Sequence, residues 1–157
     1  MKWQSVEDKI DEIYKLYNSG LYKSQHFCKY IRIPLTEQAS LRKLDEKTLR
    51  SLYHYCSSDE RCENRNARSV EEHVVPIRTI ISILTNQYEN NREQFNRQFI
   101  KEVLEKCLWV VFIISEENKK LNAVHLRHSM PNGWDWKRDS PFIRYEIAGI
   151  KVSWPSL

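Results

Sequence analysis

Glu71-Glu72-His73-Val74-Val75-Pro76 is the stretch on which the organisation of this 157-residue chain depends. An acid and a histidine stand side by side here at the edge of an apolar run. Pro76 would clash inside a continuing helix but suits the start of a new one, so we expect a strand and a loop over 69–76. The S-x-x-E pattern that ends at Glu72 is also a capping box, and this alternative interpretation places His73 in the first turn of a helix.

A second informative stretch runs from Leu108 to Asn122. Its first seven residues, Leu108 to Ile114, are continuously apolar and rich in aromatic and β-branched side chains, which predicts a buried strand. Ser115 then suits the cap of a short helix whose first turn is acidic. Asn118 and Asn122 are four residues apart and share one face of that helix; a merely exposed polar face is the alternative interpretation.

Taken together, the two stretches resemble the HNH endonucleases, also called ββα-metal or His-Me finger nucleases. In that family the first strand ends in an acidic residue or His, followed by the catalytic His and often a Pro. The second strand runs into a helix that supplies the remaining metal ligands. Residues 72–76 match the first half of this pattern, and residues 114–122 match the second half.

The resemblance implies a metal-dependent endonuclease that hydrolyses phosphodiester bonds in DNA, in a restriction or phage-defence setting. His73 would be the general base, a role that suits a group whose pKa lies near neutrality. The predicted ligands of one divalent ion are Glu72, Asn118 and Asn122, with His125, expected on the same short helix, as a further candidate. Oxygen ligands favour Mg²⁺ or Mn²⁺ over Zn²⁺.

Cationic and aromatic residues alternate after this helix. A guanidinium group binds phosphate in a bidentate manner, and aromatic rings such as those of Trp134 and Trp136 stack on bases. The predicted nucleic-acid contacts are Arg127, Lys137, Arg138 and Arg144. Aromatic side chains that only hold the loop onto the domain are the alternative. The net charge of +4 is compatible with phosphate contacts.

Composition favours a single, mostly helical α+β domain, and the resemblance implies a small ββα-metal-like element within it. Three Gly and five Pro are too few for a turn-rich β-sandwich, while 41% hydrophobic content suffices for a core. We expect a helical part over 1–57 and the candidate ββα element over 69–128, with a helical insertion over 77–107. An aromatic and basic loop, a short helix and an edge strand are expected over 129–157.

Other classes of protein find no support. The chain has no Gly-rich phosphate loop, no G-x-S-x-G elbow and no kinase signature. The apolar run over 108–114 is too short to span a bilayer, so we expect a cytoplasmic protein with no membrane partner. Cys28, Cys56 and Cys62 lack the C-x-x-C spacing of a zinc site and are interpreted as free thiols.

A second hypothesis of a different class remains open. The chain would then be a non-catalytic module that binds nucleic acid or another protein through its aromatic loop. The sequence leaves the oligomeric state open; cleavage of both strands of a duplex by a one-site nuclease often calls for a homodimer, and the edge strand over 150–154 could serve as its contact.

Overall fold

A computed structural model describes residues 5–36 and 54–153. The fold is α+β and mostly helical with one small mixed sheet, which confirms the predicted class. Two compact units can be distinguished along the chain. The first comprises residues 1–53 and 77–105, and the second comprises residues 54–76 and 106–157. Both halves of the predicted site belong to the second unit.

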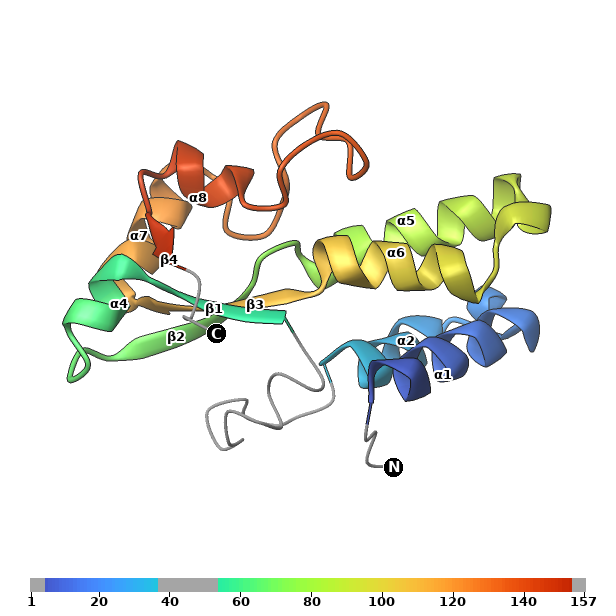
Figure 1. Cartoon of the computed structure of the whole chain (residues 1–157). Helices are drawn as coiled ribbons and strands as arrows, with labels where there is room; N and C mark the ends of the chain where they lie inside the picture. The colour runs from blue at the N-terminus through green and yellow to red at the C-terminus, as the bar shows by residue number, and fades with distance from the viewer. Residues whose placement is uncertain (1–4, 37–53, 154–157) are drawn as a thin grey trace. The chain divides into compact units, whose positions relative to one another are not determined.

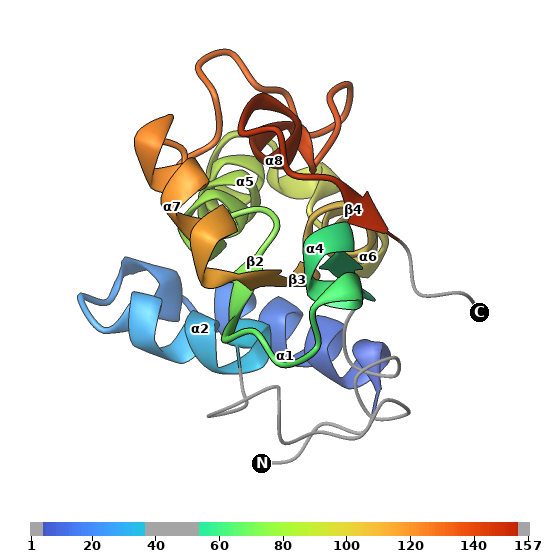
Figure 2. The ribbon, with the colours of Figure 1, turned by 90° about the vertical axis from the view of Figure 1, so that its left-hand side faces the viewer.

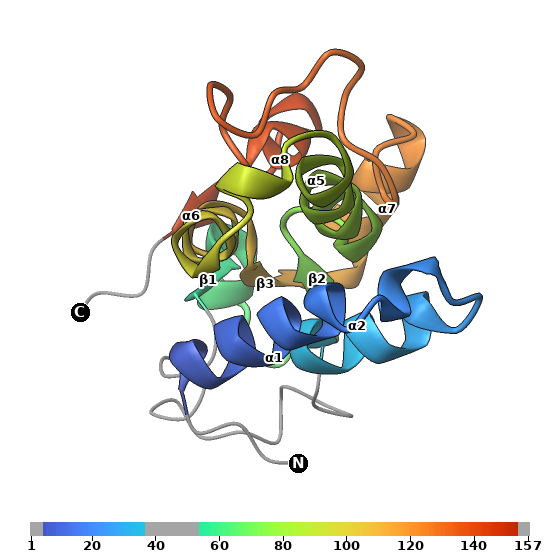
Figure 3. The same cartoon turned by 90° about the vertical axis from the view of Figure 1, so that its right-hand side faces the viewer.

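The described residues of the first unit form helices. Its elements are α1 (Val6–Asn18), η1 (Leu21–Lys23), α2 (Phe27–Thr36), α5 (Ile77–Asn90), η3 (Arg92–Gln94) and most of α6 (Arg97–Cys107). Figures 1 and 3 show α1 beside α2, and α5 beside α6. Tyr17 is fully buried in an aromatic cluster, where its hydroxyl lies 2.9 Å from the hydroxyl of Thr85.

The second unit contains the sheet, whose strand order is β2-β3-β1-β4. The strands are β1 (His54–Ser58), β2 (Ser69–His73), β3 (Trp109–Ile114) and β4 (Val152–Ser153). β3 pairs antiparallel with β2 and parallel with β1, while β4 pairs antiparallel with β1 at the edge. The strand interpretation of 69–73 is therefore confirmed, and the capping-box alternative is wrong.

Three helices complete this unit: α4 (Asp59–Glu63), α7 (Ser115–Ala123) and α8 (Ile143–Ile147). Figures 1 and 2 show α7 and α8 on the same side of the sheet. Apolar side chains from the strands and from these two helices form one core, which includes Cys56, Val74, Val111, Ile113, Leu121, Tyr145 and Ile150. Leu121 and Tyr145 thus anchor α7 and α8 to the sheet.

One boundary predicted from the sequence is wrong. The helical part was expected to extend to residue 57, but His54–Ser58 form β1. Cys56 lies opposite Val111 of β3, and its thiol donates a weak hydrogen bond to the Val110 carbonyl at 3.7 Å. Pairing with a distant strand decided this segment, since its short apolar pattern fits a helix equally well. The preceding residues, 37–53, lie outside the described part of the chain.

The predictions for the C-terminal part hold more closely. A short helix, α8, is followed by Gly149 at a φ of 70° and by β4 at the edge of the sheet. A left-handed residue after a helix end is typically glycine, which has no Cβ to clash.

Across residues 5–36 and 54–153, no helix combines the length and the apolar character needed to cross a membrane.

Candidate functional site

The end of β2 places Glu72 on the face of the sheet that α7 and α8 cover. Val70 packs against the core and Val74 is completely buried in it. Side chains alternate between the two faces of a strand, and Val74 continues the pairing because its N–H donates to the Trp109 carbonyl at 2.9 Å. Glu72 therefore lies between two core residues, on the core side. His73 follows it, partly buried, at the last position of the strand.

Glu72 is an acid in an apolar setting. Burial raises the pKa of its carboxyl, and the neighbouring charges of Arg144, Arg127 and His128 reverse only part of this rise. Its carboxylate oxygens accept no hydrogen bond from the described residues. A half-buried carboxylate with cations near it and no hydrogen-bond donor is a typical candidate for binding a ligand.

The first turn of α7 is held against the sheet by Glu117, which is 2% exposed. Its Oε2 accepts a hydrogen bond from the Ile114 N–H at 3.0 Å and another from the Ser58 hydroxyl at 2.5 Å. Ser115 is the first residue of the helix rather than its cap, because Ile114 occupies the cap position. The helix start is satisfied by the side chain of Glu117 reaching back.

Asn118 and Asn122 differ in their surroundings. Asn118 is three residues before the buried Leu121, on the side of α7 that faces the core. Its Oδ1 is buried and receives no hydrogen bond from the described residues. Asn122 is exposed on the neighbouring side of the helix. Asn118 is thus the better-placed of the two predicted ligands.

Among the described residues, no cluster of three or more His, Cys, Asp or Glu side chains could hold a metal ion. Two of the three predicted ligands are asparagines, which are not among these residue types, so the predicted ligand set could not form a cluster of this kind. His125, the additional candidate, lies beyond the end of α7, is exposed and has a φ of 58°. The expectation that His125 belongs to the same helix is wrong.

The prediction that Arg144 contacts nucleic acid is also wrong. Its side chain is 0% exposed. Nε and Nη2 donate to the carbonyls of His73 and Val74, over 2.5–3.0 Å. Nη1 donates to the carbonyls of Leu126 and Arg127, at 2.6 and 2.7 Å. With its guanidinium committed to backbone carbonyls inside the second unit, Arg144 has no donor to offer to a phosphate.

The three remaining predicted cations lie between α7 and α8. Arg127 is partly buried, and its Nε is buried without a hydrogen bond to any described residue. Lys137 and Arg138 are exposed. Both lie in a turn that the Asp135 carboxylate stabilises. This carboxylate accepts hydrogen bonds from the backbone N–H of Lys137 at 2.8 Å and from Nε of Arg138 at 3.2 Å. Arg138 thus forms an ion pair with Asp135, whereas no carboxylate of the described residues forms one with Lys137.

The contacts of Trp134 favour the alternative in which an aromatic side chain of this loop has a structural role. It is partly buried, and its indole N–H donates to the Ser140 carbonyl at 3.0 Å, which closes the loop on itself. Trp136 is partly buried, and the Lys137 ammonium lies 5.6 Å from its ring centroid. Trp136 is therefore the better candidate for a contact with a base.

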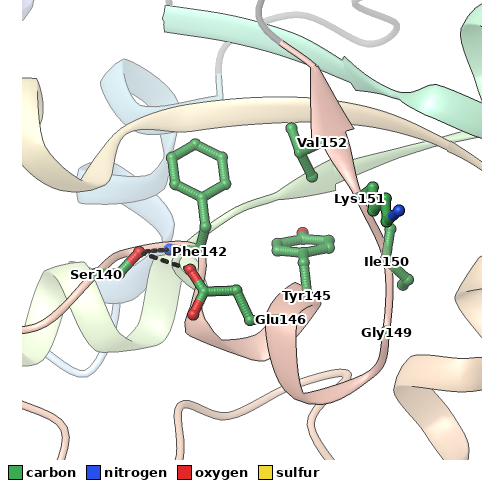
Figure 4. A pocket seen from close by; sticks show the side chains of 8 residues that line it. All are labelled: Ser140, Phe142, Tyr145, Glu146, Gly149, Ile150, Lys151 and Val152. Carbon is green, nitrogen blue, oxygen red and sulfur yellow. Dashed lines mark hydrogen bonds between the residues drawn. The ribbon is translucent and has the colours of Figure 1, made fainter.

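A pocket of about 550 Å³ opens between α8 and β4, as Figure 4 shows. Phe142, Tyr145 and Val152 supply its apolar wall, and Glu146 and Lys151 are its charged lining residues. None of Glu72, His73 or Asn118 lines it. The candidate site at the end of β2 is therefore separate from this pocket, although Tyr145 contributes to both surroundings.

Two features of the site were missed in the sequence. His128 lies close enough to Glu72 to lower the pKa of its carboxyl, and Arg144 ties the end of β2 to the segment after α7. The sequence offered no signal for this role of Arg144, because its carbonyl partners come from segments far away in the chain.

Comparison with protein-family models, curated proteins and solved structures found no match for this chain.

Proposed function

We propose that this protein is a divalent-metal-dependent endonuclease of the HNH type that hydrolyses phosphodiester bonds in DNA. One observation carries the proposal. The strand β3, paired antiparallel with β2, leads directly into α7, and two candidate ligands come from these elements: Glu72 from β2, and Asn118 from α7, whose buried Oδ1 receives no hydrogen bond from the described residues. This arrangement supports the proposal, because the resemblance implies two strands followed by a helix that carries metal ligands.

The residues present fit a hard cation. A carboxylate oxygen and an amide oxygen are ligands that Mg²⁺ and Mn²⁺ prefer, and no described residue donates to the buried Asn118 Oδ1, although a buried acceptor normally has a donor. In this proposal Glu72 and Asn118 hold the ion, and Asn122, which is exposed, contributes from the rim. When bound, such an ion supplies Lewis-acid stabilisation of charge on the phosphate.

His73 has the role of general base in this proposal. It stands directly after Glu72 at the end of β2, so the residue that takes the proton from water neighbours the residue that holds the ion. Arg127 lies near Glu72 and has a buried Nε without a hydrogen bond from the described residues, which suits it to bind the phosphate being cleaved. Lys137 and Arg138 extend the cationic surface along the loop.

The test is cleavage of supercoiled plasmid by the purified chain with Mg²⁺, Mn²⁺ or EDTA. Wild-type protein is compared with His73→Ala and with His26→Ala, which removes an exposed histidine in the first unit. Loss of a general base costs on the order of 100-fold or more in rate. We expect metal-dependent cleavage that falls by this factor in His73→Ala and is unchanged in His26→Ala.

Two outcomes contradict the proposal. The first is absence of cleavage with every metal, and DNA binding by the same protein would then favour the non-catalytic module. The second is equal cleavage by wild type and His73→Ala, which would assign the activity to a contaminant or to another site. Single-stranded DNA and RNA substrates in the same assay distinguish DNA from RNA as the target.

A further inference from the structure

The guanidinium of Arg144 holds together two chain segments that the sequence separates by an insertion and a helix. One edge of the guanidinium bonds the carbonyls of His73 and Val74, and Nη1 bonds those of Leu126 and Arg127. The Tyr145 hydroxyl, 3.4 Å from Nη2, lies at the same group. These bonds connect the end of β2 to the segment that follows α7.

Burial of the Arg144 guanidinium costs free energy, and its set of hydrogen bonds requires an arginine. A fully buried cation loses its hydration and is tolerated only where hydrogen bonds and nearby negative charge compensate. The compensation for Arg144 comes from four backbone carbonyls and the charge of Glu72. A lysine ammonium has three donors and no planar fork, so it cannot make the same set of bonds.

The two segments held by Arg144 carry the charged groups of the candidate site. Glu72 directly precedes the first pair of carbonyls, and His73 supplies one of that pair. Arg127 supplies one of the second pair, and His128 directly follows it. The sheet holds the end of β2 by itself through the bond from the Val74 N–H to the Trp109 carbonyl. The segment after α7 has no strand pairing, so its position depends more heavily on the guanidinium.

We propose that Arg144 is the positioning residue of this site, which fixes the Arg127–His128 segment relative to the Glu72–His73 strand end. The proposal rests on the proposed nuclease function for its catalytic consequence. Arg144 touches neither ion nor substrate and acts through the backbone of residues that do. Its hydrogen bonds hold two segments that are distant in sequence in one fixed arrangement. A catalytic or binding site requires such preorganisation of its side chains.

The test compares full-length wild type with Arg144→Lys and with Ile113→Ala. Ile113 is fully buried in the same core, and its truncation weakens the second unit without removing a bond of Arg144. Mn²⁺ affinity is measured by calorimetry, and kcat and KM for DNA cleavage are measured well below the unfolding temperature of each variant. Amide hydrogen exchange is followed at residues 74–75 and 126–128.

Arg144→Lys is expected to weaken Mn²⁺ binding by about 10-fold and to lower kcat by about 10- to 100-fold, as loss of a group that orients ligands does. KM should change much less. Amide protection should fall at 126–128, with a smaller fall at 74–75. Ile113→Ala should leave the Mn²⁺ affinity, kcat and the relative protection of these segments unchanged. Equal losses in both variants, or none in Arg144→Lys, would overturn the positioning role.

A chemical rescue separates the guanidinium from general packing. Arg144→Ala is assayed with guanidinium chloride well below denaturing concentration and with methylammonium chloride at the same ionic strength. Guanidinium alone should restore protection at 126–128 and part of kcat, while restoration by both salts or by neither contradicts the proposal. If wild type neither binds Mn²⁺ nor cleaves DNA, the nuclease proposal fails, and hydrogen exchange still decides the role of Arg144.

Discussion

At the scale of single residues, the most informative group is the Glu72 carboxyl. It lies on the core side of β2 between Val70 and Val74, where an apolar side chain would pack without cost. Burial of a carboxylate destabilises the native state, and the nearby charges of Arg144, Arg127 and His128 offset only part of this cost; in the proposed function a bound cation would offset more of it.

The pKa of Glu72 leads to a prediction about stability. Since the carboxyl binds a proton more tightly in the folded than in the unfolded chain, its favourable contribution is complete below the unfolded-state pKa, near 4.5, and is lost as the pH rises through the higher folded-state pKa. In EDTA, Glu72→Gln should therefore be more stable than wild type at neutral pH, and the difference should shrink towards pH 4. Urea unfolding at several pH values measures it.

A difference that is independent of pH would contradict this assignment. Glu71→Gln is the matched control, because it makes the same chemical change at the adjacent position of the same strand. Both variants are unfolded over the same pH range, and a change in stability of the same size in Glu71→Gln as in Glu72→Gln would contradict the assignment to Glu72.

The four cysteines supply a second prediction at this scale. Burial raises the pKa of the Cys56 and Cys107 thiols to about 12, whereas Cys28 and Cys62 are exposed. Iodoacetamide at pH 8 should therefore modify Cys28 and Cys62 in the native protein and all four residues in urea, because only an accessible thiolate reacts. Mass spectrometry of tryptic peptides identifies them, and rapid native labelling of Cys56 would contradict its place in the core.

At the scale of elements, the connection from β3 to α7 depends on Glu117. Removing its side chain leaves the Ile114 N–H and the Ser58 hydroxyl without their acceptor, and a buried polar group left unsatisfied costs about 1–3 kcal/mol. We expect Glu117→Ala to lower the free energy of unfolding by this amount in urea denaturation.

Glu116→Ala is the control for this change, since Glu116 is exposed one position earlier on the same helix. It should alter the free energy of unfolding by less than about 0.5 kcal/mol. A loss of the same size in both variants would indicate that the helix dipole, rather than the buried acceptor, stabilises this turn.

Elements that have a long or strongly biased apolar pattern were predictable from the sequence. The strand at 109–114 and the helices α5 and α6 follow from their side chains alone, and Pro76 separates β2 from α5 as expected. β1 was not predictable, because five residues with one buried cysteine carry too little pattern and the strand forms by pairing with β3. Local propensity gives way to tertiary pairing in such short segments.

At the scale of the whole molecule, nucleic-acid binding is expected to depend on where the charge lies rather than on its sum. The net charge of +4 is modest, so affinity should come from the loop between α7 and α8. Changing Lys137 and Arg138 together to Gln should weaken DNA binding and reduce the slope of log affinity against log salt by roughly 1 to 2.

The matched control for this pair is Lys15→Gln with Lys23→Gln, which removes the same charge from exposed positions in the first unit. Fluorescence anisotropy with a labelled duplex at several salt concentrations measures both pairs. An equal loss of affinity in the two double variants would indicate that net charge, and not this loop, attracts DNA.

The sequence by itself determined the α+β class, the strands on either side of the insertion, and the adjacency of Glu72 and His73, because these depend on local pattern and on neighbours in the chain. Only the tertiary structure decided that Asn118 faces the core while Asn122 is exposed, and that Arg144 is buried. The reason is physical: four backbone carbonyls from two distant segments surround the guanidinium of Arg144, and nothing in its neighbours along the chain specifies them.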